Sequence, residues 1–137
     1  MITAVDTNIL IDILEGDVEF GAASAAALAR AARDGALVAC EVVWAEVATA
    51  YAPDADVADD LRALGLRFLP MSEDAALRAS HAWAGYRRAG GSRRRIAADV
   101  LIGGHATCQA DRLLTRDEGF HREHFAGLRV ENPGAGT

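Results

Sequence analysis

Residues 1–14 read MITAVDTNILIDIL, and this stretch does most to decide the fold. Residues 2–5 have the short apolar character of a buried strand, and residues 8–14 follow as a short helix. A strand that leads at once into a helix is typical of a βα unit in a parallel sheet. Asp6 stands where the strand ends, so we expect its side chain at the carboxyl edge of that sheet.

The rest of the chain repeats this alternation. Further strands are predicted at residues 36–40, 66–69, 112–114 and 128–130. Further helices are predicted at residues 18–33, 41–51, 56–64, 73–89 and 97–110. The alternation predicts an α/β fold, a three-layer α/β/α sandwich around a mostly parallel five-stranded sheet. The 137 residues fit one domain, which we place at residues 1–131, with residues 132–137 as a disordered tail.

The charged residues exclude several kinds of chemistry. All 14 basic residues are arginine, so a P-loop phosphate site and a Schiff base are excluded. The 20 acidic residues give a formal net charge of −6, which taken alone argues against a nucleic-acid partner. No apolar run is long enough to span a membrane, and the N-terminus lacks the pattern of a signal peptide. We therefore expect a cytoplasmic protein without a membrane partner.

The two cysteines indicate no metal or redox chemistry. Cys40 and Cys108 are far apart in the sequence and belong to no CxxC pair, so neither a zinc site nor a disulfide framework is indicated. We expect both to be small buried residues.

Glu46 is the acidic residue whose position is hardest to explain by structure alone. In a helix over residues 41–51, its face is shared by Val42, Val43, Thr49 and Ala50. A carboxylate on such an apolar stripe is unfavourable unless it is paired or binds a metal. An ion pair with an arginine is the structural alternative.

Three more acids are expected at the same edge of the sheet. Asp6 ends the first strand, Asp117 follows the fourth, and Asp99 lies in the first turn of a helix that returns to this edge. Each has a structural interpretation, as a helix cap, as a turn residue or as an acid near a helix dipole. Four carboxylates converging on one edge would repel one another, and a bound divalent cation resolves that conflict. Oxygen ligands favour one or two Mg²⁺ or Mn²⁺ ions, and the matching chemistry is phosphodiester hydrolysis.

Four stretches around these acids resemble the signature of the PIN-domain family, most closely the VapC-type ribonuclease toxins of toxin–antitoxin pairs. They are AVDTNILI at Asp6, VVWAEVATAY at Glu46, AADVLIGGHA at Asp99 and LLTRDEGF at Asp117. The resemblance implies an Mg²⁺- or Mn²⁺-dependent endoribonuclease that forms a homodimer and is inhibited by a cognate antitoxin. It also implies that these four acids bind the metal.

The resemblance extends to supporting residues, with one departure. Asn8 and Thr115 match supporting polar positions of the family. Cys40 departs from the pattern, because many members have Ser or Thr just after the second strand. That departure puts a minor polar contact in doubt and leaves the acidic set in place.

Arginines stand close to two of these acids. Arg87 and Arg88 precede a Gly-Gly pair before Asp99, and we name Arg93, Arg94, Arg95 and Arg116 as candidate contacts to RNA phosphates. A solvated charge run at the end of a helix explains the cluster before Asp99 equally well, so both interpretations stay open. His121 and His124 have a spacing that could hold a metal, but no third ligand is evident, so we interpret them as surface or packing residues.

Two other classes of protein are weighed against the nuclease. A non-catalytic PIN-fold domain that binds RNA or protein would share the fold without turnover. A receiver-type phosphotransfer domain also has an acidic carboxyl edge, but the absence of lysine counts against it.

Overall fold

The computed structural model describes residues 1–51, 56–90 and 97–134. Within them a five-stranded sheet has the order β3-β2-β1-β4-β5, and every neighbouring pair is parallel. The strands are β1 (Thr3–Val5), β2 (Leu37–Ala39), β3 (Leu66–Phe68), β4 (Arg112–Leu114) and β5 (Val130–Glu131). The predicted α/β architecture is confirmed, and the sheet is wholly parallel.

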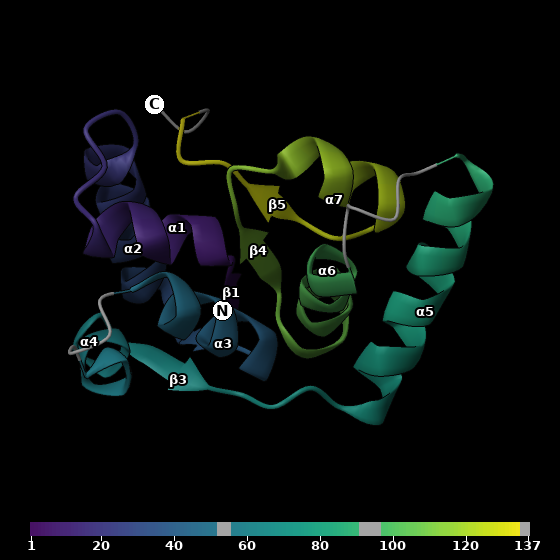
Figure 1. Cartoon of the computed structure of the whole chain (residues 1–137), viewed down its shortest axis with the longest axis horizontal. Helices are drawn as coiled ribbons and strands as arrows, with labels where there is room; N and C mark the ends of the chain where they lie inside the picture. Colours follow the sequence, from purple (N-terminus) through teal and green to yellow (C-terminus); the bar gives the residue numbers. More distant parts are fainter. Residues whose placement is uncertain (52–55, 91–96, 135–137) are drawn as a thin grey trace.

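Helices cover both faces of the sheet. Figure 1 shows α1 and α2 on one side of β1, β4 and β5, and α5 and α6 on the other. In the described residues the helices are α1 (Thr7–Leu14), α2 (Gly21–Asp34), α3 (Glu41–Ala50), α4 (Val57–Ala63), α5 (Glu73–Arg88), α6 (Ala97–Gln109) and α7 (Glu118–His124). None of them is long and apolar enough to cross a membrane.

The strand order creates a switch point between β1 and β4. The chain leaves β1 towards β2 and β3, and it later returns to the other side of β1 as β4. In open α/β sheets, ligands bind at the carboxyl ends of the strands where the order reverses in this way. The β1–β4 register pairs Val5 with Leu114, so the next residues, Asp6 and Thr115, emerge side by side there.

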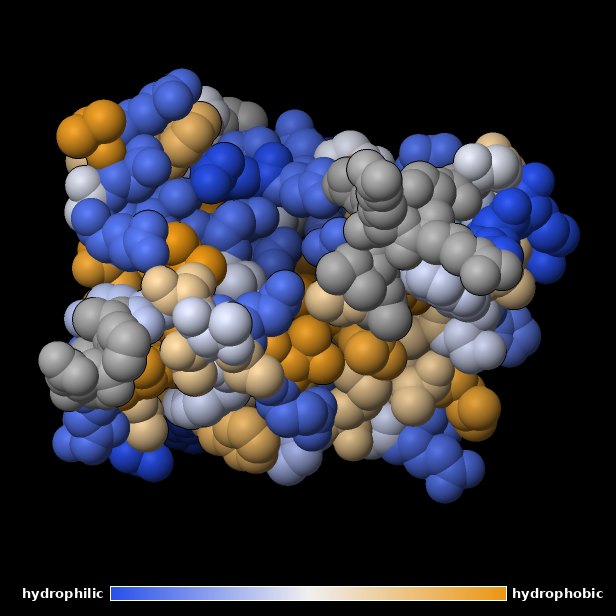
Figure 2. Space-filling view, viewed as in Figure 1, coloured by the Kyte–Doolittle hydropathy of each residue, from blue (hydrophilic) through white to orange (hydrophobic). Residues whose placement is uncertain are grey.

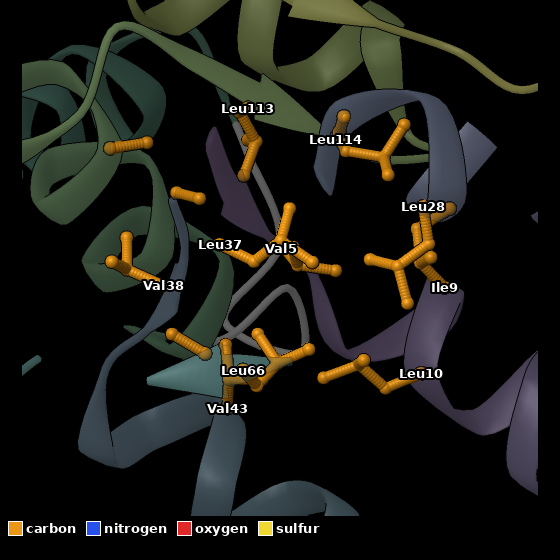
Figure 3. Close-up of a cluster of buried hydrophobic side chains, with 14 of the residues drawn as sticks. Val5, Ile9, Leu10, Leu28, Leu37, Val38, Val43, Leu66, Leu113 and Leu114 are labelled. Atoms are coloured by element: carbon orange, nitrogen blue, oxygen red, sulfur yellow. The ribbon is translucent and has the colours of Figure 1, made fainter. Parts of the chain in front are cut away.

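A continuous apolar core holds this edge in place. All residues of β1, β2 and β4 are buried, as expected for strands covered on both faces. Figure 3 shows side chains of the sheet gathered with those of three helices, for example Ile9 of α1, Leu28 of α2 and Val43 of α3. The site residues at the ends of β1 and β4 therefore project from a packed platform.

The structure corrects three sequence expectations. A helix was expected from residue 18, but α2 begins at Gly21, because the Asp17 carboxylate accepts hydrogen bonds from the backbone N–H groups of Glu19 and Phe20 and forms a turn. The helix α7 was not predicted, because Gly119 weakens its helical pattern. Cys108 is exposed, whereas Cys40 is buried as expected.

The first residues of the expected tail, residues 132–134, lie in the part of the chain that the structure describes. Pro133 is buried, and the Asn132 amide donates to the carbonyl oxygen of Arg116 at 3.5 Å. Residues 135–137 lie outside the described residues, so a disordered tail stays a prediction.

Candidate functional site

Asp6 is the most buried of the four predicted acids, with 4% of its surface exposed. It caps the N-terminus of α1, where its Oδ1 accepts a hydrogen bond from the Thr7 backbone N–H at 2.7 Å. Its Oδ2 accepts one from the Thr115 hydroxyl at 2.7 Å, and the Asn8 amide nitrogen lies 3.5 Å away. The helix cap considered for Asp6 is therefore present, and its second oxygen faces the end of β4.

Thr115 links the ends of β1 and β4. Its hydroxyl donates to Asp6 and accepts a hydrogen bond from the Asp117 backbone N–H at 2.9 Å. A hydroxyl carries one donor and two acceptor positions, so both bonds are allowed at once. Asn8 completes the link, because its carbonyl oxygen accepts from the Arg116 backbone N–H at 3.2 Å. The predicted supporting residues thus connect two of the predicted acids.

Glu46 joins this edge from α3. Its Oε1 accepts a hydrogen bond from the Thr7 hydroxyl at 2.7 Å, next to the Asp6 cap. The side chain is half-buried and lines an open hollow of about 410 Å³ between α1 and α3. The arginine partner considered for Glu46 does not occur among the hydrogen bonds and ion pairs found in the described chain.

Asp99 and Asp117 lie at the same end of the sheet. Asp117 precedes α7 directly and is half-buried. Asp99 lies in the first turn of α6 and is half-buried too. Because α6 ends at Gln109 and β4 begins at Arg112, the helix runs back along the strand, and its first turn faces the carboxyl edge. How closely Asp99 approaches Asp6 and Asp117 stays a prediction.

Arg116 has a structural partner of its own. Its guanidinium forms two hydrogen bonds with the buried Asp12 carboxylate, at 2.8 and 3.0 Å, and lies 4.0 Å from the centre of the Phe20 ring. The bonds to Asp12 raise the pKa of Arg116 above its ordinary value. This pairing competes with the predicted contact to RNA phosphate. Arg93, Arg94 and Arg95 lie outside the described residues.

His121 lies beside the Asp6 carboxylate, a contact that the interpretation of His121 as a surface or packing residue did not include. It is fully buried on α7, and its Nε2 lies 3.6 Å from Asp6 Oδ2. The expectation of a packing residue is correct for His121 and for His124, which lies against the Phe120 ring. The sequence spacing agrees with this position, because His121 lies one helical turn after Asp117.

The side chains at this edge offer oxygen atoms, and hard divalent cations prefer oxygen ligands. In the described part of the chain, no three acidic, histidine or cysteine side chains converge closely enough to hold an ion as they stand. Mg²⁺ does not require such a cage, since one or two carboxylates, waters and substrate phosphates commonly complete its shell. Asp6 offers one such carboxylate, and the Thr7 backbone N–H, the Thr115 hydroxyl and the Asn8 amide hold it in place.

Fold and geometry together define an α/β protein with a buried carboxylate, that of Asp6, at the topological switch point of its sheet. The sequence matches the PIN domain family over residues 3–125. The chain therefore belongs to the PIN domain family. It matches no curated protein significantly.

Solved structures share the fold at low sequence identity. VapBC2 from Rickettsia felis, bound to a DNA fragment from its promoter, superposes with a TM-score of 0.74 at 19% identity, over 96% of this chain and 98% of that one. VapBC-1 from nontypeable Haemophilus influenzae gives 0.70 at 18% identity, over 98% and 99%. A toxin–antitoxin complex from Klebsiella pneumoniae gives 0.62 at 21% identity, over 96% and 97%.

Proposed function

We propose that the protein is a divalent-metal-dependent endoribonuclease and the toxin of a type II toxin–antitoxin pair. One observation carries the proposal: Asp6 and Asp117 are joined through Thr115 at the switch point between β1 and β4. Membership of the PIN domain family and the fold shared with a toxin–antitoxin complex support it.

The proposal assigns two kinds of role to the residues, binding the cation and orienting a metal ligand. Asp6, Glu46, Asp99 and Asp117 would hold one or two Mg²⁺ or Mn²⁺ ions, and Asn8 and Thr115 would orient Asp6. When bound, the cation supplies Lewis-acid stabilisation of the charge that develops on the phosphodiester. The hollow beside Glu46 offers room for RNA at this edge. A carboxylate of this set that is not bound to a cation would accept the proton of the attacking water.

A protein partner is also part of the proposal. Trp83, Val100 and Leu101 line a shallow apolar depression between α5 and α6. Figure 2 shows apolar residues gathered over α6 and the adjoining side of α5. Such a surface suits an antitoxin or a second copy of the chain, and the net charge of −6 suits a basic antitoxin.

The protein would act in the cytoplasm, where its RNA substrates occur.

Cleavage of RNA by the purified protein tests the proposal. Single-stranded RNA incubated with Mg²⁺ or Mn²⁺ should be cut internally, and chelation should stop the reaction. Asp6→Asn and Asp99→Asn should abolish cutting, because each removes a carboxylate from the metal edge. Asp111→Asn is the matched control, since Asp111 lies at the other end of β4 and holds the Ile2 backbone N–H.

Two results would contradict the proposal. Cleavage that persists in both Asp6→Asn and Asp99→Asn would show that these carboxylates do not form the active site. Binding of RNA without cleavage at any divalent ion concentration would favour the non-catalytic alternative.

A further inference from the structure

The His121 ring is a buried polar group without an obvious purpose in the fold. It is 0% exposed, and neither ring nitrogen has a hydrogen-bond partner among the described residues. Buried polar groups are nearly always hydrogen-bonded, so each exception asks for an explanation. The Asp6 carboxylate lies close to this ring, with Oδ2 3.6 Å from Nε2.

The local structure holds the ring in this place. Because α7 begins directly after Asp117, His121 sits one turn into the helix and faces back towards the end of β1. The ring lies against Phe120, at 5.2 Å between ring centres, and against Phe125, at 6.0 Å. Both phenylalanines are buried, so the imidazole has little freedom to turn away from Asp6.

The negative charge of the Asp6 carboxylate favours a proton on Nε2. With the proton on Nδ1, the lone pair of Nε2 would face the lone pairs of Asp6 Oδ2, and the two would repel each other. With the proton on Nε2, the ring points a donor at the carboxylate. A shift of a few tenths of an ångström then converts the 3.6 Å approach into a hydrogen bond.

We propose that His121 is a positioning residue that directs its Nε2–H at Asp6 Oδ2 and holds this carboxylate in the orientation needed to bind a divalent cation. The inference rests on the proposed function, because it concerns the same acidic edge. Thr115 and Asn8 approach the same oxygen, so three side chains from α1, α7 and the end of β4 fix one carboxylate. Partners of this kind commonly change metal affinity without touching the ion.

Mn²⁺ affinity measured by titration calorimetry tests the role. His121→Leu fills the space without a donor and should weaken Mn²⁺ binding about tenfold or more. His121→Gln carries an amide donor at a similar reach and should restore most of the affinity. His124→Leu is the matched control, because His124 lies on the same helix and packs on Phe120 and Tyr86. It should leave Mn²⁺ affinity unchanged even where thermal stability falls.

A second measurement needs no metal. Long-range ¹H–¹⁵N correlation spectra of the metal-free wild-type protein report which nitrogen of His121 carries the proton. The proposal expects Nε2, and it expects that preference to weaken in Asp6→Asn.

Several outcomes would overturn the inference. The absence of a proton on Nε2 would do so, as would unchanged Mn²⁺ affinity in His121→Leu or an equal loss in His124→Leu. Failure of the proposed function looks different, because the wild-type protein would then bind no Mn²⁺. The ring proton would still decide whether His121 faces Asp6 as a donor.

Discussion

At the scale of single residues, Thr115 connects the end of β1 to the chain that follows β4. Its buried hydroxyl is the shared partner of the Asp6 carboxylate and the Asp117 backbone. Thr115→Val keeps the shape and removes both bonds. We expect the free energy of unfolding to fall by about 2 kcal/mol, because a hydrogen bond to a buried carboxylate is lost. Urea unfolding followed by circular dichroism measures this change.

Thr115→Ser is the control, since it keeps the hydroxyl and loses only a methyl group. It should retain more stability and more Mn²⁺ affinity than Thr115→Val. Equal behaviour of the two variants would show that the hydroxyl does not matter.

The Arg116–Asp12 pair joins α1 to the chain after β4. Asp12 is 3% exposed, and the Ser24 hydroxyl also donates to it at 2.9 Å. Arg116→Ala leaves that carboxylate without its cation, which should reduce the free energy of unfolding by about 3 kcal/mol. A double-mutant cycle with Asp12→Ala checks the coupling, because the double variant should lose less than the sum of the single losses. Strict additivity would mean that the pair contributes nothing to stability.

At the scale of elements, two glycines set the packing of α6. A side chain at Gly104 would meet the Ala75 carbonyl oxygen of α5 at 2.6 Å, and one at Gly103 would collide with the buried Phe125 ring. Gly104→Ala should therefore force α5 and α6 apart. We expect a loss of about 1–3 kcal/mol in the free energy of unfolding, measured by denaturant titration.

Gly85→Ala is the matched control within α5. The added methyl would find only Arg88 Nη2, at an ordinary 3.9 Å. Because alanine favours helix over glycine, this variant should gain about 0.5–1 kcal/mol. A destabilised Gly85→Ala together with an unchanged Gly104→Ala would contradict the packing account.

The elements also show where sequence reasoning succeeds. The apolar strands and the acids at their ends follow from local pattern, because a parallel sheet brings the ends of its strands to one edge. The contacts of Glu46 with Thr7 and of Arg116 with Asp12 join residues far apart in the chain, and no local pattern specifies them. The approach of His121 to Asp6 was not predicted for the same reason, since it also joins residues far apart in the chain.

At the scale of the whole molecule, stability should depend on pH through His105. This buried ring lies with Nε2 2.9 Å from the Leu69 carbonyl oxygen, and burial lowers the pKa of His105 below its ordinary value of 6.5. Below that value the unfolded chain binds the proton more readily than the folded one. Stability should therefore fall as the pH drops from 6.5 towards the lowered pKa of the folded state.

Unfolding free energies measured between about pH 8 and about pH 5 check this. His105→Gln keeps a donor for the Leu69 carbonyl but does not titrate, so its stability should fall less on acidification than that of the wild type. The same pH dependence in both proteins would exclude His105 as its source.

The proposed function requires the carboxylates at the switch point to form one metal centre. Anomalous diffraction from crystals of the wild-type protein soaked in Mn²⁺ tests it most directly. We predict a manganese peak at the carboxyl edge, within bonding distance of an oxygen of Asp6 and of at least one of Asp99 and Asp117. Manganese found only elsewhere, or no peak at this edge in the presence of excess ion, would contradict the claim.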